Sequence, residues 1–251
     1  MQGLILTQVD GPVATIVLNR PERHNSLVPE LLRDLLTALE KVADARAVVL
    51  AAEGRSFSTG GDVRAFAERD GGALRDYANE LVGLLGETML AIMRLPAPVI
   101  AAVHGMVTGG SLGLLLASDI VLIHPSVTIA PWYTTVGFAP DGGWTALLPY
   151  RIGASRAAVV QYTNTPIDAE TAVAWGLATR VEADVRRAAA ELARTIAGQR
   201  PGAVRATKRL INGDLDAIAA RLDAEREAFV RQITTPEARE GMTAFLSRAA
   251  R

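Results

Sequence analysis

The sequence contains no cysteine in its 251 residues. This absence excludes a disulfide framework and any mechanism that depends on a thiolate, and it fits a reducing compartment. A signal peptide is not predicted, because residues 1–10 have the pattern of a strand interrupted by polar residues and begin with no charged segment. We therefore expect a protein of the cytoplasm.

Long apolar runs and dense positive charge are also absent. Arg94, His104 and Asp119 interrupt the best apolar runs before they reach the roughly 18 residues that cross a membrane. The chain has 26 Lys and Arg residues against 27 Asp and Glu residues, and no block of the sequence is rich in Lys or Arg. Because nucleic acids and anionic membranes are bound by concentrated positive charge, we expect neither partner.

Histidine is scarce, and its positions do not indicate a metal site. The three histidines, His24, His104 and His124, share no spacing such as H-x-x-x-H. Zinc sites place their ligands at short, regular intervals. We therefore expect no metal, and the histidines are interpreted as structural.

Two glycine pairs organise the chain. The stretch 98–119, PVIAAVHGMVTGGSLGLLLASD, predicts a buried strand, a break at Gly105 and an apolar helix after Gly109-Gly110. The second pair, Gly60-Gly61, lies upstream in FSTGGD. Glycine allows the backbone to approach a ligand closely, and the first turn of a helix has free N–H groups. If the two segments meet, their N–H groups form an oxyanion hole.

The remaining pattern predicts an α/β chain whose last third is helical. We expect strands at 4–9, 13–18, 47–52, 120–123 and 127–129, and helices at 29–42, 76–95, 155–161, 168–175, 183–197, 201–212, 215–233 and 236–251. A short helix and a mobile loop are expected within 62–72. The stretch 131–143, PWYTTVGFAPDGG, is expected to be irregular and to line a site.

Four motifs, in collinear order, resemble the crotonase superfamily of enoyl-CoA hydratases and isomerases. They are NRPERHNSL, FSTGGDV, the stretch 98–119 and EAREGMTAFLSR, and the similarity extends from about Leu4 to Arg248. The resemblance implies a spiral of ββα units at 1–195 and a helical trimerisation region at 196–251, giving a homotrimer or a dimer of trimers. It also implies an acyl-CoA substrate that brings its own coenzyme A, with no further cofactor.

The resemblance assigns roles to individual residues. The N–H groups of Gly61 and Gly110 would polarise the thioester carbonyl and hold the enolate that forms. Preorganised hydrogen-bond donors stabilise the negative charge of such an enolate. It also implies that coenzyme A is contacted by Arg23, His24, Thr59, Phe229 and Arg248. The last two of these residues would reach the coenzyme of a neighbouring subunit.

The acid/base candidate is Asp141. The two carboxylates of typical hydratases fall on Gly113 and close to Tyr133, and neither residue is acidic. Asp141, in APDGG, matches the single catalytic Asp of isomerases similar to the ring-epoxide isomerases of phenylacetate breakdown. One base and an oxyanion hole suffice to move a proton between C2 and C4 of an enoyl chain. On the residues alone, an Asp before Gly-Gly is also typical of a turn or a helix cap.

We therefore predict double-bond isomerisation of an enoyl-CoA, with enoyl-CoA hydration as the alternative and a non-catalytic acyl-CoA-binding protein as a further one.

Two other mechanisms fit parts of the sequence less well. The sequence GGSLGLLLASD, followed by a loop with Trp and an Asp, also resembles the 4-chlorobenzoyl-CoA dehalogenases, but their supporting His falls near Leu90. The segment 109–113 also fits the G-x-S-x-G motif of serine hydrolases. That mechanism needs a His well downstream of Ser111, where only His124 follows.

Overall fold

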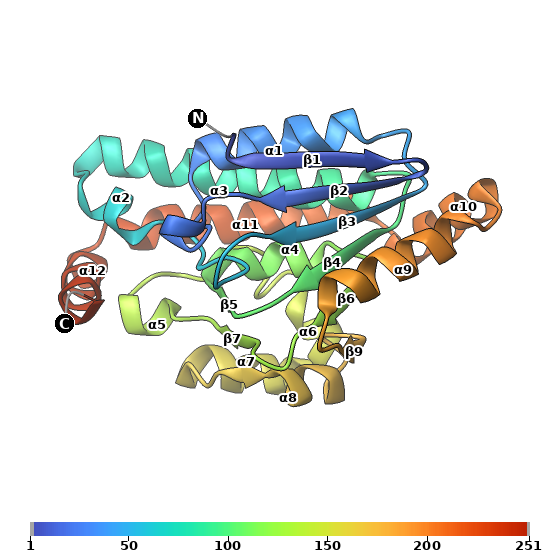
Figure 1. The fold of residues 1–251 in the computed structure, drawn as a ribbon. Helices are drawn as coiled ribbons and strands as arrows, with labels where there is room; N and C mark the ends of the chain where they lie inside the picture. The colour runs from blue at the N-terminus through green and yellow to red at the C-terminus, as the bar shows by residue number, and fades with distance from the viewer. Residues whose placement is uncertain (1–2, 250–251) are drawn as a thin grey trace.

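The computed structural model describes residues 3–249. Their larger sheet, across the centre of Figure 1, has six strands in the order β1-β2-β3-β4-β6-β9. β1 pairs with β2 antiparallel, and the other neighbours pair in parallel. The strands are β1 (Ile5–Asp10), β2 (Val13–Leu18), β3 (Ala47–Ala52), β4 (Val99–Val103), β6 (Ile120–Ile123) and β9 (Arg180–Val181). The strands predicted at 4–9 and 13–18 are present as β1 and β2, and they form a hairpin.

The centre of this sheet is covered on both faces. Every residue of β3 and β4 is buried, as expected for apolar parallel strands between helices. Val48 and Leu50 of β3 face the cluster that contains α1 (Pro29–Lys41) and α3 (Gly71–Arg94), whereas Val49 faces α9 (Val185–Ala197). This alternation arises because successive side chains of a strand point to opposite faces.

A second, three-stranded sheet lies beside the first, with β5 (Met106–Thr108), β7 (Thr128–Ala130) and β8 (Ile167–Asp168) in the order β5-β7-β8. Pairs of strands alternate with helices along the chain: β4 and β5 precede α4 (Leu112–Leu116), and β6 and β7 precede α5 (Tyr133–Val136). The sequence pattern predicted no strand beyond residue 155, where the structure has β8 and β9. Each has two residues, too few to show a strand period.

Three helical segments differ from expectation. α3 begins at Gly71, five residues before the predicted start, because glycines in a first turn weaken a helix without preventing it. The short helix predicted within 62–72 is present as α2 (Val63–Ala67), but the loop expected after it is shorter, because α3 already begins at Gly71. The stretch 131–143 contains the one-turn helix α5, and α6 (Leu148–Ile152) follows it without having been predicted.

The C-terminal helices wrap around the core and extend beyond it (Figure 1). They are α7 (Ala154–Thr163), α8 (Ala169–Ala174), α10 (Pro201–Asn212), α11 (Leu215–Ile233) and α12 (Pro236–Ala249). α11 packs along α3, and α12 lies against α2 and α5. The predicted division between 195 and 196 falls within α9 and stays a prediction. Among the described residues no helix is long and apolar enough to cross a membrane.

A buried ion pair fastens α10 to the core. Lys208 is the buried residue of this helix, and its Nζ lies 2.9 Å from Oδ2 of Asp119. The same ammonium group donates to the carbonyls of Ile92 and Ala97 at 3.0 Å each. Burial lowers the pKa of Lys208, and the adjacent carboxylate of Asp119 opposes that shift. The tip of α10 projects from the body of the protein in Figure 1.

Candidate active site

The two glycine segments lie side by side, although they are far apart in the sequence. Ser58 N–H donates to the carbonyl of Met106 at 3.2 Å, and Thr108 N–H donates to the carbonyl of Ser58 at 3.1 Å. Gly60 has a φ of +74°, and a Cβ there would lie 2.5 Å from the carbonyl oxygen of Thr108. Only glycine therefore permits this approach of the two backbones.

Gly61 directs its N–H toward a cavity. It forms a parallel bridge with Leu27, whose N–H donates to Gly60 and whose carbonyl accepts from Asp62. The residues on either side of Gly61 therefore bond to Leu27, and the N–H of Gly61 itself points the other way. Gly61 lines the same cavity as Gly110.

Gly110 lies in a short 3₁₀ helix, η2 (Gly109–Ser111), whose first N–H groups have no partners within the helix. The hydroxyl of the next residue, Ser111, is fully buried and lies 2.9 and 2.7 Å from the carbonyl oxygens of Ser58 and Thr108, either of which can accept its proton. Ser111 therefore joins the two glycine segments. The structure gives it this role in place of the nucleophile that the G-x-S-x-G motif suggested.

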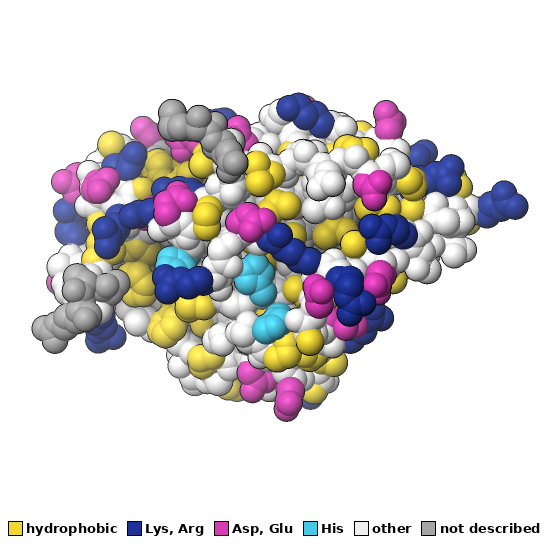
Figure 2. Space-filling view, viewed as in Figure 1, with side chains coloured by type: hydrophobic (Ala, Val, Ile, Leu, Met, Phe, Trp, Pro, Cys, Tyr) yellow, Lys and Arg dark blue, Asp and Glu magenta, His cyan; other side chains and the backbone are white. Residues whose placement is uncertain are grey.

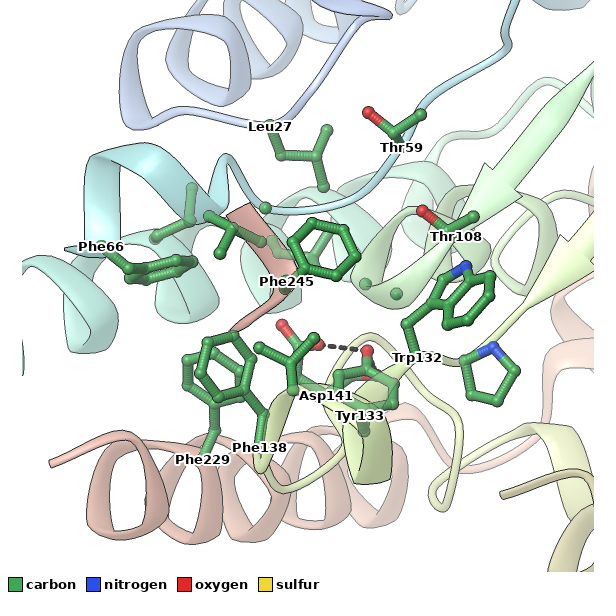
Figure 3. A pocket seen from close by; sticks show the side chains of 18 residues that line it. Leu27, Thr59, Phe66, Thr108, Trp132, Tyr133, Phe138, Asp141, Phe229 and Phe245 are labelled. Atoms are coloured by element: carbon green, nitrogen blue, oxygen red, sulfur yellow. Dashed lines mark hydrogen bonds between the residues drawn. The ribbon is translucent and has the colours of Figure 1, made fainter. Parts of the chain in front are cut away.

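The cavity between these segments has a volume of about 70 Å³ and a largely apolar wall. Three phenylalanine rings form one side of it, Phe66, Phe138 and Phe229, with centroids 5.3 to 5.9 Å apart. Figure 3 shows Phe245 reaching the same space from α12. Trp132 closes the wall with a φ of +60°, an uncommon backbone conformation for a bulky residue.

Asp141 is the acidic residue of this cavity wall. It is buried, and a Cβ on Gly110 would lie 3.0 and 3.1 Å from its two carboxylate oxygens. The hydroxyl of Tyr133 donates to Oδ1 of Asp141, as the dashed line in Figure 3 marks, and lies 3.1 Å from the backbone carbonyl of Asp141. The structure thus brings Gly61, Gly110 and Asp141 together around one space.

The surroundings of Asp141 raise the pKa of its carboxyl group toward neutral pH. Burial raises the pKa of this carboxyl from 3.8 to about 7, the negative charge of Glu225 adds to the shift, and the hydrogen bond from Tyr133 opposes it. Burial and the charge of Asp141 raise the pKa of Tyr133 well above its ordinary value. At neutral pH the tyrosine keeps its proton, and Asp141 is able to accept or release one.

A larger hollow of about 470 Å³ opens outside the cavity and shares Thr59 and Gly61 with it. Arg23 and His24 also line this hollow. Arg23 places a guanidinium nitrogen 2.9 Å from Oδ2 of Asp62, so part of its charge is neutralised within the protein. Figure 2 shows histidine side chains, in cyan, grouped near Lys and Arg side chains on this face.

The histidines are held by local contacts. His24 lies 3.1 Å from the Ser56 hydroxyl through Nδ1, and its Nε2 lies 3.2 Å from a guanidinium nitrogen of Arg55. His124 makes a comparable contact to Ser126 at 2.8 Å. Among the described residues no three His, Cys, Asp or Glu side chains are grouped to hold a metal ion. None of the histidines lines the cavity around Asp141.

Phe229 and Arg248 occupy different environments. Phe229 is 3% exposed and forms part of the cavity wall of its own chain, whereas Arg248 is exposed in the last turn of α12. Contact of either residue with the coenzyme A of a neighbouring subunit stays a prediction. Thr59 lies between the cavity and the outer hollow, and its N–H donates to the carbonyl of His24 at 3.2 Å.

Sequence reasoning did not foresee the hydrogen bonds that two residues, Trp144 and Glu225, make in this site. Trp144 donates from Nε1 to the carbonyl of Gly109 at 2.7 Å and so fixes the start of η2. Glu225 bonds the segment after Asp141 from α11. A signal for Glu225 was present, because it occupies the buried stripe of α11 together with Leu222 and Phe229. A charged residue in an apolar stripe indicates a specific buried partner.

Comparisons with known proteins identify the family of the chain. A sequence model of the enoyl-CoA hydratase/isomerase family matches residues 8–250, and the chain belongs to that family. It is 32% identical to the 1,2-epoxyphenylacetyl-CoA isomerase of Escherichia coli, over 99% of this chain and 97% of that protein. It is 28% identical to the 4-chlorobenzoyl coenzyme A dehalogenase-2 of an Arthrobacter species, over 96% and 90% of the two chains.

The fold expected from the motifs, the crotonase fold, is confirmed. A crystal structure of an enoyl-CoA hydratase/isomerase from Mycobacterium paratuberculosis superimposes with a TM-score of 0.89 at 32% identity. The similarity covers 97% of this chain and 99% of that one. The helical C-terminal section is part of the shared architecture, because the similarity covers nearly the entire chain.

Proposed function

We propose that this protein isomerises the double bond of an enoyl-CoA, with Asp141 as its single acid/base. One observation carries the proposal: among the described residues the cavity wall has one carboxylate, that of Asp141, which lies against Gly110 and has a pKa of about 7. A base with a pKa near the working pH both takes and returns a proton efficiently.

In the proposed mechanism, coenzyme A occupies the outer hollow beside Arg23, His24 and Thr59, and the acyl group enters the inner cavity. The thioester oxygen accepts hydrogen bonds from the N–H groups of Gly61 and Gly110. Ionised Asp141 removes a proton from C2 of a 3-enoyl thioester, leaving a dienolate whose charge rests on that oxygen. Asp141 then returns the proton to C4, and the product is the conjugated 2-enoyl thioester of unchanged mass.

The size of the cavity favours a short, uncharged acyl group. A dry cavity of about 150 Å³ takes one benzene ring, and the cavity beside Asp141 has about half that volume. Apart from Asp141, the described residues of its wall offer no charged side chain to pair with an ionised acyl group. We therefore propose a short aliphatic enoyl thioester as substrate.

Hydration of the double bond is the alternative. A hydratase of the usual kind positions its water between two carboxylates, and Gly113 leaves no space for one of them. A Cβ at Gly113 would lie 2.5 Å from Sδ of Met89 and 2.9 Å from the carbonyl oxygen of Gly142. Hydration here would need Tyr133 to help Asp141 position the water. A non-catalytic acyl-CoA-binding protein is the further alternative, and it would have no use for a base.

For assembly we propose a homotrimer or a dimer of trimers. The support is the tip of α10, where Leu210 and Ile211 are 84% and 76% exposed while Lys208 ties the same helix to the core. Adjacent large apolar side chains with this exposure suit contact with a second copy of the chain. Light scattering after size-exclusion chromatography measures the mass directly.

The test of the proposed reaction uses 3-enoyl-CoA and 2-enoyl-CoA thioesters with the wild-type protein and Asp141→Asn. Conjugated-thioester absorbance and product mass are followed together. Isomerised product of unchanged mass, lost in the variant, supports the proposal. A product heavier by one water assigns hydration. Binding without turnover of either thioester assigns the binding protein, and turnover retained by Asp141→Asn removes Asp141 from the mechanism.

A further inference from the structure

A second buried carboxylate lies behind the segment that carries Asp141. Glu225 of α11 is 5% exposed. Its Oε2 accepts from the N–H of Gly143 at 2.7 Å, and its Oε1 accepts from the N–H of Thr145 at 2.7 Å. Oε1 also accepts from the Thr145 hydroxyl at 2.7 Å and from the N–H of Ala146 at 2.9 Å.

These contacts fit an ionised carboxylate. Three of the four partners are backbone N–H groups, which can only donate, and an ionised carboxylate offers acceptors alone. In the part of the chain that the structure describes, no Lys, Arg or His nitrogen lies within 4.0 Å of the Glu225 carboxylate. The charge is therefore balanced by the dipoles of the segment 143–146 and not by a cation.

The segment that Glu225 holds touches both parts of the proposed catalytic apparatus. Asp141 lies just before it in the chain, with its carboxylate against Gly110. Gly142, with a φ of +62°, lies so close that a Cβ there would be 2.4 Å from the carbonyl oxygen of Gly110. Trp144 bonds the carbonyl of Gly109. The relative position of the base and of the oxyanion donor thus depends on this one segment.

We propose that Glu225 is a positioning residue for the reaction, an inference that rests on the function proposed above. By holding residues 143–146 against α11, it keeps the carboxylate of Asp141 and the N–H of Gly110 directed at the same point of the cavity. Two consecutive glycines, Gly142 and Gly143, make this segment intrinsically flexible, so it needs an outside contact to take one conformation.

Glu225 also acts on Asp141 through its charge. Its negative charge adds to burial in raising the pKa of Asp141, and the hydrogen bond from Tyr133 of α5 opposes both. Among the cavity-lining residues, which come from α2, α3, α5, α11, α12, β5, η2 and loops, Tyr133 is the other titratable group. The neighbouring arginines of α11 do not pair with Glu225: Arg221 donates to the carbonyl of Thr145 in the same segment, and Arg226 pairs with Asp223.

The first test is Glu225→Gln, which keeps the volume but places an amide nitrogen against backbone N–H donors, so that at least one contact is lost. We expect kcat to fall by about 10- to 100-fold. KM should stay within about twofold, because Arg23, His24 and Thr59, beside which coenzyme A is proposed to bind, lie on other segments. Without the charge of Glu225, the pKa of Asp141 falls, and the acidic limb of the kcat–pH profile moves to lower pH.

Two further variants separate positioning from a general effect on folding. Glu227→Gln changes an exposed carboxylate of the same helix, paired only loosely with Arg231 at 3.6 Å, and should leave kcat and the pH profile unchanged. Thr145→Val removes one of the four contacts and keeps the charge of Glu225. It should lower kcat less than Glu225→Gln does and shift the pH profile little, and it remains informative if Glu225→Gln fails to fold.

A measurement independent of turnover completes the test. The side-chain carboxyl carbon of Asp141, observed by ¹³C NMR and assigned by its loss in Asp141→Asn, reports the pKa directly. A lower pKa in Glu225→Gln together with the selective loss of kcat supports the inference. An unchanged pKa and kcat in a folded Glu225→Gln protein overturns it, even if Asp141→Asn is inactive. If Asp141→Asn keeps full turnover, the proposed function fails, and the titration still shows whether Glu225 acts on Asp141.

Discussion

The hydroxyl of Tyr133 donates a hydrogen bond to the carboxylate of Asp141, and both residues are buried in the wall of one cavity. Burial raises the pKa of Asp141, and this hydrogen bond opposes the increase because it stabilises the ionised form. The tyrosine therefore limits how far burial shifts Asp141 toward its neutral form, and it holds one of the two carboxylate oxygens, Oδ1.

Removing the donor in Tyr133→Phe should raise the pKa of Asp141 above about 7. The ascending limb of the kcat–pH profile should then move to higher pH, and the rate at pH 7 should drop by up to about 10-fold for every pH unit by which that pKa rises. The profile is measured from pH 5 to 9. Tyr162→Phe, at an exposed position, is the matched control. A profile unchanged by Tyr133→Phe would contradict this account of the Tyr133–Asp141 pair.

Ionised Asp141 should also lower the free energy of unfolding above neutral pH. Its folded-state pKa of about 7 exceeds its ordinary 3.8, so the folded protein holds a proton that the unfolded chain releases between these values. The stabilising contribution of this group is complete below about pH 4 and is lost as the pH rises to about 7. Asp141→Asn should therefore raise the free energy of unfolding at pH 8, by on the order of 2–4 kcal/mol, and by less at pH 5.

Urea unfolding at the two pH values measures this difference. Asp34→Asn, at an exposed position of α1, is the control and should show no such dependence on pH. Equal stabilities of Asp141→Asn and the wild-type protein at pH 8 would mean that ionisation of Asp141 does not destabilise the folded protein. The assignment of a raised pKa to Asp141 would then have to be abandoned.

A side chain at Gly110 should abolish the reaction. In Gly110→Ala the new Cβ would lie about 3 Å from both carboxylate oxygens of Asp141 and 2.8 Å from Cδ2 of Leu85, so it displaces the base from the oxyanion donor. We expect kcat to fall by about 100- to 1,000-fold. Gly72→Ala is the control, because nothing lies within 4 Å of a Cβ there. Substantial activity in Gly110→Ala would exclude Gly110 from the oxyanion hole.

Shortening the side chain of Phe138 should widen the range of acyl groups that the protein accepts as substrates. Phe138 packs edge-on against Phe66 and Phe229 at one side of the cavity and is only partly buried, so Phe138→Ala enlarges the cavity without removing a core residue. The ratio of kcat/KM for a long enoyl-CoA to that for a short one should rise by about 10-fold or more. Comparing both substrates in wild type and variant measures this ratio. If the ratio is unchanged, Phe138 does not limit the acyl group.

The sequence predicted most of the fold because the signals are local. The apolar β-branched runs at β3 and β4 and the Asp10-Gly11-Pro12 turn determine those elements over a few residues. It placed the start of α3 five residues late and missed β8 and β9. The two-residue strands exist through their partners, since β8 is defined by pairing with β7 and β9 by pairing with β6.

By itself the sequence determined the family, the positions of Gly61, Gly110 and Asp141, and the lack of the usual carboxylate at Gly113, because these depend on residue types in a fixed order. Only the tertiary structure decided what surrounds them. The elevated pKa of Asp141 arises from burial and from the negative charge of Glu225, against the opposing hydrogen bond from Tyr133, and Glu225 reaches Gly143 across 82 positions. Burial and electrostatic coupling depend on distance in space, which no local pattern of residues encodes.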